Sequence, residues 1–346
     1  MNRCSIVILN WNGRDYLRSL LPVLRKHSEL PGVDIVVADN ASTDESLEFL
    51  DETHPGIRQI RFEENHGFAG GYNRALAQLD SQYHILLNSD VEVTPGWLEP
   101  LLDFMDTHPE AGACAPKILD YFQRDRFEYA GAAGGFIDRY GYPFCRGRIF
   151  HHLETDKGQY DKALPVFWAS GACLVVRSEA FREAGGLDEA FFAHMEEIDL
   201  CWRMQKQGRR VYSVPSSAVY HVGGGSLSAE NPHKTYLNYR NNLLLLYKNL
   251  PPEKRSRILF IRKILDGISA LRFLVLGQRK DLVAVFRAHR AYSGMKKGYN
   301  GTERENHSGK NDVIVNGIYP GSIVAECFLR GKRSYHQLEG SFAKNK

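Results

Sequence analysis

The first 90 residues alternate short apolar runs with segments of helical periodicity. Apolar runs rich in β-branched residues predict buried strands, and apolar residues spaced three or four apart predict amphipathic helices. We therefore expect strands at 5–12, 34–42, 57–62 and 83–87, with helices at 14–26, 43–50 and 68–79 between them. Because strands that alternate with helices need crossover connections, this pattern predicts an α/β fold with a mainly parallel sheet.

The middle of the chain continues the pattern less regularly. We expect a helix at 96–105, a strand followed by a helix at 167–181, a helix within 185–208 and two short strands within 208–226. Residues 120–166 are rich in Gly, Tyr and Arg and have no clear period. We expect irregular loops there, of the kind that cover and grip a polar ligand, without a role for any single residue.

Two strongly apolar helices, interrupted by charge, are predicted at 236–251 and 257–277. In the second helix the rest of the circumference is apolar and the polar residues share one narrow stripe, formed by Arg262, Lys263, Asp266, Ser269 and Arg272. A wide apolar face flanked by cations is typical of a helix that lies in an anionic membrane surface. We prefer that interpretation to a helical pair packed on the rest of the chain or a dimer interface.

Composition and charge narrow the class of protein. The chain has 346 residues, enough for one large α/β domain and an appendage. Residues 251–300 hold 12 Lys and Arg against 3 Asp and Glu, whereas residues 1–250 are net acidic. The chemistry is therefore expected in the acidic body, and attachment to an anionic partner in the basic stretch. We expect no nucleic-acid partner.

Cysteine usage and hydropathy indicate a cytoplasmic protein. The six cysteines are scattered without a C-x-x-C pair, which argues against a zinc ribbon or a disulfide framework. Free thiols suit a reducing cytosol. The N-terminal apolar run is too short for a signal peptide, and no stretch approaches the roughly 18 uncharged apolar residues of a spanning helix.

The candidate chemistry begins where the fourth predicted strand ends. An apolar run at 85–87 is followed directly by Asn88, Ser89 and Asp90. Ligands of open α/β sheets bind just beyond the carboxyl ends of the strands. These side chains are therefore well positioned to hold a cation and a phosphate, although a turn that happens to contain Asp gives the same pattern.

Two neighbouring strand ends carry further candidates. Asp39 follows the second strand, and its carboxylate can accept hydrogen bonds from a base N–H or from ribose hydroxyls. Trp11 follows the first strand and offers a flat face to a base. The alternatives are a helix N-terminal charge for Asp39 and ordinary packing for Trp11. The sequence lacks a G-x-G-x-x-G turn, which argues against a dinucleotide dehydrogenase.

A glycine-rich segment at 64–76 precedes the third predicted helix. Gly67 and its neighbouring glycines permit close approach of the backbone to a sugar or phosphate, while Asn65 and Asn73 add amide groups. A plain glycine turn before a helix is the alternative.

Acidic residues and a histidine mark the second half of the site. Glu196, Glu197 and Asp199 crowd the start of a predicted helix, either as a complement to the helix dipole or as a general base beside a bound metal. His221 precedes three glycines that would let a ligand come close, which makes it a candidate metal ligand.

Taken together, these motifs resemble glycosyltransferase family 2, most closely its bacterial rhamnosyltransferase-like members. The resemblance covers roughly residues 4–250 and rests on six motifs in the family's order: IVILNWNG, IVVADNASTDES, ENHGFAGGYNRAL, ILLNSDVEV, GLDEAFFAHMEEIDLCWR and VYHVGGGS. It implies the GT-A fold, a nucleotide-diphosphate-sugar donor and usually Mg²⁺ or Mn²⁺ as cofactor.

The resemblance also implies roles for single residues. Asp39 matches the family's base- or ribose-binding aspartate, with Trp11 beside it. Asn88 to Asp90 matches the D-x-D element, so Asp90 would bind the metal, while Asn88 stands where the family has another aspartate. His221 matches a histidine that completes metal coordination in some members.

The EEID segment matches the family's E-D-x-D element. Glu197 falls on the position of the catalytic base, and Glu196 and Asp199 would support it. One base opposite one leaving group implies a single displacement with inversion. The expected acceptor is a glycan or a lipid-linked glycan in cell-surface polysaccharide synthesis. The alternatives are a nucleotidyltransferase and a non-catalytic nucleotide- or glycan-binding relative.

The implied organisation has three parts. Residues 1–235 would form the GT-A catalytic domain, with a nucleotide-binding half at about 1–118 and an acceptor half at about 119–235. Residues 236–300 would form the basic amphipathic helical region, and residues 301–346 a tail without an assigned function. We expect the protein in the cytoplasm, peripheral on the inner face of the cytoplasmic membrane.

Overall fold

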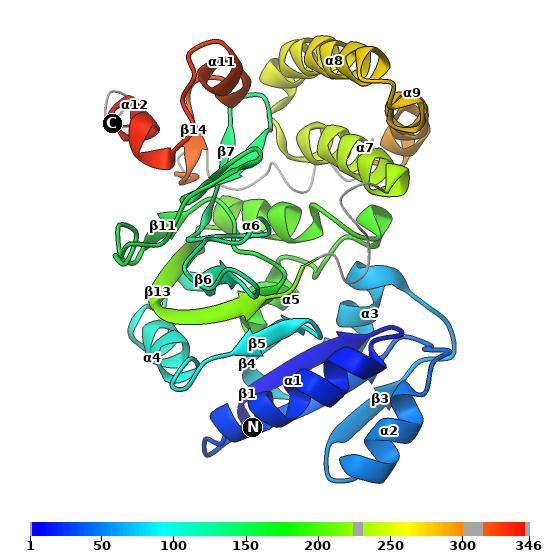
Figure 1. Cartoon of the computed structure of the whole chain (residues 1–346), viewed down its shortest axis with the longest axis vertical. Coiled ribbons are helices and arrows are strands. Elements are labelled where there is room, and N and C mark those ends of the chain that lie inside the picture. Colours follow the sequence, from blue (N-terminus) through cyan, green and yellow to red (C-terminus); the bar gives the residue numbers. More distant parts are fainter. Residues whose placement is uncertain (1, 224–230, 300–313, 343–346) are drawn as a thin grey trace.

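A computed structural model describes residues 2–223, 231–299 and 314–342 of the chain (Figure 1). Its large sheet has nine strands: β1 (Asn2–Asn10), β2 (Val33–Asp39), β3 (Arg58–Arg61), β4 (Ser81–Asn88), β5 (Val91–Val93), β6 (Ala111–Asp120), β11 (Leu164–Val166), β12 (Cys173–Arg177) and β13 (Arg210–His221). The strand order is β11-β13-β6-β12-β4-β1-β2-β3, and β5 pairs with β13. The predicted α/β fold with a mainly parallel sheet is confirmed.

The register of the sheet brings polar strand ends together. Strand β1 pairs in parallel with β2 on one side and with β4 on the other. Asn10 therefore lies opposite Asp39, and Leu9 lies opposite Asn88. Because parallel strands end at the same edge, the candidate residues after β1, β2 and β4 share that edge, as predicted.

Six helices accompany this sheet within the first 223 residues: α1 (Arg14–His27), α2 (Ser46–Thr53), α3 (Gly67–Leu76), α4 (Glu99–Thr107), α5 (Ser178–Glu183) and α6 (Glu196–Lys206). Helix α1 buries the four leucines that predicted it, Leu17, Leu20, Leu21 and Leu24. Strand β1 is buried on both faces, because Ile6 and Ile8 join one apolar cluster and Val7 joins another. This is the pattern expected of a central parallel strand.

Two expectations for the middle of the chain are wrong. Residues 120–166 were expected to be irregular, but they supply most of a second sheet, in which β10 (His152–Leu153), β9 (Arg148–Ile149), β8 (Pro143–Cys145), β7 (Gly135–Asp138) and β14 (Ile318–Tyr319) lie in that order. These strands of two to four residues are too short to carry a visible period.

The second wrong expectation concerns residues 208–226. The described part forms one strand, β13, rather than two. Its register against β6 shifts between Ser213 and Ala218, around Pro215, so the strand is interrupted without a reversal of the chain. Proline is tolerated in a sheet at such irregularities. The glycines at 224–225 lie outside the described residues.

The C-terminal part is helical and lies at the end of the molecule opposite α2 (Figure 1). It comprises α7 (Pro232–Asn249), α8 (Pro252–Val275) and α9 (Arg279–Met295), followed by α11 (Ile323–Phe328), α12 (Glu339–Phe342) and short 3-10 helices at Lys296–Tyr299 and Tyr335–Leu338. A further 3-10 helix, Glu189–Phe191, precedes α6. Of the predicted tail at 301–346, residues 301–313 and 343–346 lie outside the described residues.

Helix α8 turns its polar stripe partly inward. Arg262 and Asp266 are buried and paired, with Arg262 Nε donating to Asp266 at 2.8 Å. His289 of α9 is 3.1 Å from the other Asp266 oxygen, and the Arg262 guanidinium lies 3.8 Å from the centre of the Tyr142 ring. The expected alternative of helices packed on the body is therefore present in the structure.

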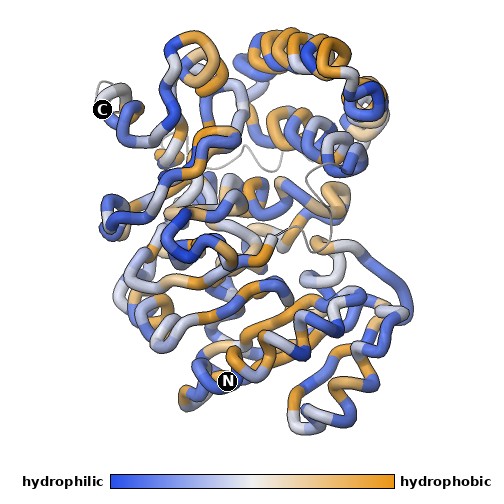
Figure 2. Tube along the Cα trace, viewed as in Figure 1, coloured by the Kyte–Doolittle hydropathy of each residue, from blue (hydrophilic) through white to orange (hydrophobic). Residues whose placement is uncertain are grey.

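The opposite side of α8 is apolar and exposed. Figure 2 shows the hydrophobic residues along this helix. It carries Phe260, Ile264, Ile268, Leu271 and Val275, and α9 adds Val283 and Phe286. Exposed cations flank this apolar face: Lys263, Arg272, Arg279, Lys280, Arg287 and Arg290. None of the described helices is long and apolar enough to cross a bilayer.

The buried Arg262–Asp266 pair gives a test of how α8 is attached. We expect Asp266→Asn to lower the free energy of unfolding by about 3 kcal/mol, because it leaves a buried guanidinium without its counter-charge. Glu253→Gln, in the exposed first turn of the same helix, is the control and should change stability by less than about 0.5 kcal/mol. Urea unfolding measures both. Equal stability of the two variants would contradict the buried pair.

Candidate active site

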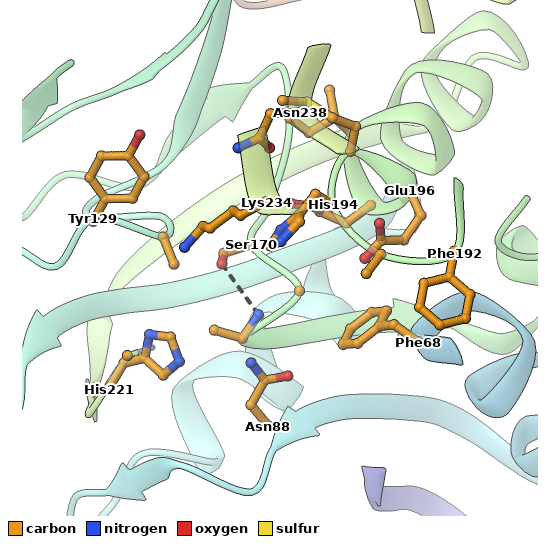
Figure 3. A pocket seen from close by; sticks show the side chains of 18 of the residues that line it. Phe68, Asn88, Tyr129, Ser170, Phe192, His194, Glu196, His221, Lys234 and Asn238 are labelled. Atoms are coloured by element: carbon orange, nitrogen blue, oxygen red, sulfur yellow. Dashed lines mark hydrogen bonds between the residues drawn. The ribbon is translucent and has the colours of Figure 1, made fainter. Parts of the chain in front are cut away.

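A pocket of about 680 Å³ opens at the carboxyl edge of the large sheet (Figure 3). One wall comes from the strand ends and the loops after them, the opposite wall from the second sheet and from α7 and α8. Of the predicted site residues, the pocket is lined by Trp11, Asn65, Gly67, Asn88, Asp90, Glu196, Glu197 and His221. Asp39, Asn73 and Asp199 do not line it.

The first wall is organised by buried amide and carboxylate groups. Asp39 lies beneath the pocket, where its carboxylate accepts from Asn10 Nδ2 at 2.9 Å and from the Ser42 backbone N–H at 2.9 Å. These bonds fix the loops after β1 and β2. The Trp11 side chain stands at the pocket and is 51% exposed, so its ring is free to cover a flat ligand.

Asn40 is a lining residue that the sequence reasoning missed. Its Nδ2 donates to Asn65 Oδ1 at 2.9 Å, and its Oδ1 accepts from the His66 N–H at 3.0 Å. Its place directly after Asp39, at the same strand end, was the available signal. This pair of amides holds the glycine-rich segment against the end of β2.

Gly67 begins α3 in a conformation that suits glycine. Its φ is +69°, and a Cβ there would stand 2.5 Å from the Phe192 ring. The glycine thus permits the close approach of α3 to the loop before α6. Asn73 also attaches α3 to the segment before α6. Its Nδ2 donates to the Leu187 carbonyl at 2.7 Å, and its Oδ1 accepts from the Leu187 N–H at 2.9 Å.

Asp90 and His221 come together, although 131 residues separate them. His221 Nε2 is 3.2 Å from Asp90 Oδ1, and His221 Nδ1 is 3.2 Å from Glu128 Oε2. Burial lowers the pKa of His221, but the hydrogen bonds and negative charges of Asp90 and Glu128 outweigh it and raise the pKa to about 10. Glu128 was missed because it lies in the aperiodic segment.

Asp90 and His221 can hold a divalent cation only if a bound substrate supplies the remaining coordinating atoms. In the described part of the chain, no cluster of three or more His, Cys, Asp or Glu side chains is arranged to hold a metal ion. Asp90 and His221 nevertheless lie together at a single point of the pocket, and a cation that binds there would displace one ring proton of His221 so that its imidazole could coordinate. Mg²⁺ and Mn²⁺ sites in enzymes commonly combine one or two protein ligands with substrate phosphates.

Two adjacent carboxyl groups lie on the other side of the pocket, at the start of α6. Glu196 is buried and Glu197 is half-buried, and Oε2 of each has no hydrogen-bond partner among the described residues. Burial raises the pKa of Glu197 to about 7. Burial and the neighbouring Glu197 raise the pKa of Glu196 well above its ordinary value. A carboxyl group with a pKa near neutrality is suited to proton transfer.

The segment before α6 is held from outside by α7. Asn241 Nδ2 donates to three backbone carbonyls, those of Phe191 at 3.0 Å, Ala193 at 2.8 Å and His194 at 2.7 Å. His194 and Met195 have φ angles of 67° and 74°, so this backbone is strained and needs such support. Sequence reasoning missed Asn241, an amide beside a run of leucines.

Asp199 lies one turn below Glu196 and is fully buried. It accepts from Arg203 at 2.7 Å, Lys248 at 2.8 Å and Asn249 at 2.7 Å. Burial alone would raise its pKa, but the charges of Arg203 and Lys248 and the hydrogen bonds from Lys248 and Asn249 lower the pKa to about 2. Asp199 therefore ties α6 to the end of α7.

Carboxylate, amide and imidazole groups at the carboxyl ends of the strands make this edge of the α/β sheet chemically suited to a phosphate-bearing ligand. The chain belongs to glycosyl transferase family 2, whose family model matches residues 5–185. The chain is therefore a glycosyltransferase that uses a nucleotide-sugar donor, and the nucleotidyltransferase alternative is not favoured.

Curated relatives agree with this family. The chain is 32% identical over 234 residues to an N-acetylglucosaminyl-diphospho-decaprenol L-rhamnosyltransferase of Mycobacterium tuberculosis, a match that covers 62% of this chain and 75% of the relative. It is 25% identical over 251 residues to the low-salt glycan biosynthesis hexosyltransferase Agl10 of Haloferax volcanii, with 69% and 74% covered.

Solved structures share the fold. Residues 1–349 of S. aureus TarS superpose with a TM-score of 0.53 at 16% identity, covering 91% of this chain and 95% of that chain. GalNAc-T7, solved with UDP, GalNAc and Mn²⁺, gives a TM-score of 0.52 at 18% identity and covers 76% of this chain and 55% of that chain. At these identities the similarity establishes the GT-A fold alone.

The ion pairs of Asp199 predict how stability depends on pH. The folded-state pKa of about 2 lies below the ordinary value of 3.8, so the contribution is present above pH 4 and is lost as the pH falls toward 2. We expect Asp199→Asn to cost about 2 kcal/mol at pH 7 and less at pH 3. Urea unfolding at both pH values measures this difference.

Asp15→Asn is the matched control, because Asp15 is an exposed carboxylate. It should leave the free energy of unfolding nearly unchanged at both pH values. A cost of Asp199→Asn that is the same at pH 3 and pH 7 would contradict the ion-pair explanation.

Proposed function

We propose that this glycosyltransferase moves a hexosyl residue from a nucleoside-diphosphate sugar to a hydroxyl group of a glycan or lipid-linked acceptor, with inversion, in cell-surface polysaccharide synthesis. The observation that carries the proposal is the pair of carboxyl groups of buried Glu196 and half-buried Glu197, whose Oε2 atoms have no hydrogen-bond partners among the described residues, in the pocket that also contains Asp90 and His221. The name of the Mycobacterium relative, an N-acetylglucosaminyl-diphospho-decaprenol L-rhamnosyltransferase, supports the sugar and acceptor classes.

The donor would occupy the wall formed by the strand ends. Trp11 would cover the base, and Asp39 would keep the loops after β1 and β2 in position or meet the ribose after a rearrangement of its bonds to Asn10 and Ser42. The segment with Asn65 and Gly67 would face the nucleotide, with Asn73 fixing α3 behind it.

The diphosphate would lie at the end of β4, near Asn88 and Asp90. Asp90 and His221 would hold Mg²⁺ or Mn²⁺ there, and the bound cation would neutralise negative charge that develops on the leaving diphosphate. Asn88 contributes an amide rather than a second carboxylate, so the phosphates would supply more of the coordination. Glu128 would keep the His221 ring oriented, in the way carboxylates commonly orient metal-binding histidines.

The transfer itself needs one base. Glu197 would take the proton from the acceptor hydroxyl group while the hydroxyl oxygen bonds to the anomeric carbon. The bond from that carbon to the diphosphate oxygen breaks, and the electron pair leaves with the nucleoside diphosphate. Attack opposite the leaving group inverts the anomeric centre. Glu196 would remain protonated beside Glu197, and Asp199 would anchor the helix that carries both.

The exposed apolar face of α8 and α9 supports attachment to an anionic membrane surface. Its apolar side chains point away from the body, and its flanking Lys and Arg residues match the charge of acidic lipid headgroups. Such attachment would place the protein on the inner face of the cytoplasmic membrane. The helical region at 236–300 would bind the membrane there, and it would thereby bring the catalytic part, proposed as residues 1–235, close to a lipid-linked acceptor.

The catalytic assignment predicts a selective loss of turnover. We expect Glu197→Gln to reduce kcat by about 10²–10⁴-fold, because no base then takes the proton from the hydroxyl group of the acceptor substrate. Nucleotide binding should stay intact. Glu189→Gln is the control, since Glu189 is exposed and lies eight positions upstream of Glu197. Turnover and nucleotide affinity are measured separately, and an unchanged kcat for Glu197→Gln would remove the assignment.

The same base predicts the pH profile. Glu197 acts as a carboxylate, and its pKa is raised to about 7, so kcat of the wild type should rise through about pH 7 and level off above it. A profile that is already flat from pH 5 upward would argue against a base with a raised pKa.

Membrane attachment is measured by flotation with anionic vesicles of phosphatidylglycerol. We expect the wild type to float, and the double variant Phe260→Ser/Ile268→Ser to bind at least about tenfold more weakly because it removes two exposed apolar side chains that would enter the membrane surface. Phe122→Ser removes an equally exposed aromatic side chain elsewhere and should float like the wild type. Wild-type protein that stays in the soluble fraction would contradict the membrane proposal.

A further inference from the structure

The pocket extends past Glu196 and Glu197 to the second sheet. Tyr142, Arg148 and Phe150 line this far wall, together with α7 and α8. Arg148 is the residue that needs an explanation. It lies in the two-residue strand β9, lines the pocket, and is only 5% exposed.

Arg148 forms no ion pair with a carboxylate in the described chain, and the charge of Glu128 acts on it only from beyond ion-pair distance. One guanidinium nitrogen contacts Cys145 Sγ at 3.4 Å, and the guanidinium lies 4.4 Å from the centre of the Tyr129 ring. Its Nε has no hydrogen-bond partner among residues 2–223, 231–299 and 314–342. By contrast, Lys117 and Arg262 are buried against carboxylates, at 2.7 Å from Asp156 and 2.8 Å from Asp266.

A buried cation without a counter-ion is costly. Moving a charged group out of water carries a penalty of several kcal/mol unless an opposite charge or hydrogen bonds compensate for it. The sulfur contact and the ring face are weak substitutes for an oxyanion. A planar guanidinium with a free N–H that lines a pocket is well suited to a phosphate group.

The surroundings of Arg148 indicate where such a phosphate group would lie relative to the proposed site of transfer. Burial raises the pKa of the Cys145 thiol, Arg148 lowers it, and the charges of Glu128 and Glu197 raise it further. Cys145 therefore lies within electrostatic reach of Glu197, the proposed base, and both Cys145 and Arg148 lie within electrostatic reach of Glu128. Lys234 extends across the same pocket (Figure 3) and adds positive charge to it.

We infer that Arg148 binds a phosphate group of the acceptor, close to the sugar that receives the new residue. This inference rests on the proposed function and narrows it, because the acceptor is then a phosphate-linked glycan rather than a neutral one. The donor diphosphate has the same chemistry and comes from the other wall, so a test must separate the two sources of phosphate.

Binding to protein whose donor side is already filled separates them. The protein is saturated with Mn²⁺ and with whichever of UDP, dTDP or GDP binds it, and farnesyl diphosphate or inorganic pyrophosphate is then titrated by calorimetry. The variants are Arg148→Gln and Arg148→Lys. Arg139→Gln is the matched control, because Arg139 is an exposed arginine just after β7 in the same small sheet.

We expect wild type and Arg139→Gln to bind farnesyl diphosphate equally, and Arg148→Gln to bind it about tenfold or more weakly. Arg148→Lys should lose less, because it keeps the charge but not the planar fork. The dissociation constant of the nucleotide should stay within about twofold of wild type in each variant, which also shows that the variants are folded. Pyrophosphate should respond to Arg148 in the same direction.

Four results would overturn the inference. Farnesyl diphosphate that does not bind the loaded wild type, or that binds Arg148→Gln equally well, removes the phosphate site. A parallel loss of nucleotide affinity in Arg148→Gln and Arg148→Lys assigns Arg148 to the donor. If no nucleotide binds wild-type protein, the proposed function fails, and this inference fails with it.

Discussion

The buried carboxylate of Asp199 joins the parts of this molecule on which the proposed catalysis depends. It accepts hydrogen bonds from Arg203 in its own helix and from Lys248 and Asn249 at the end of α7. The first turn of α6 carries Glu196 and Glu197, so the same bonds fix the proposed base relative to the C-terminal helices. Asn241 adds a second attachment by holding the strained backbone before α6. Helix α7 is thus part of the active-site structure.

Local patterns allowed the nucleotide side of the fold to be predicted, and long-range packing limited the rest. Strands β1, β2 and β4 are continuous apolar runs, so their carboxyl ends and the residues there could be read directly from the sequence. Glu128 and Arg148 could not, because they lie in strands and loops too short for a period and reach the pocket only through the second sheet. The inward side of α8 was also hidden, since a helical pattern does not say which face meets the protein.

The pocket has walls of different electrical character. The strand-end wall combines amides with the Asp90–His221 contact, the start of α6 contributes two carboxyl groups with raised pKa values, and the far wall contributes the buried guanidinium of Arg148. In the proposed reaction, the strand-end wall would suit the donor diphosphate, the two carboxyl groups would suit the acceptor hydroxyl, and Arg148 would suit the acceptor phosphate. The exposed apolar face of α8 and α9 lies on the helices that also support the far wall, which would connect a membrane surface with the acceptor side.

Nucleotide binding is the property to measure first, because every proposed role depends on it. Thermal unfolding is followed with UDP, dTDP, GDP and ADP, each with Mn²⁺ or with a chelator, for wild type and Asp90→Asn. A ligand at 100 times its dissociation constant adds about 2.7 kcal/mol to the stability of the folded state, which raises the melting temperature measurably. We expect one nucleotide to stabilise the wild type with Mn²⁺, and the effect to disappear with the chelator and in Asp90→Asn. If no nucleotide changes the melting temperature, the chain does not hold a donor at this pocket, and the proposed transfer reaction is contradicted.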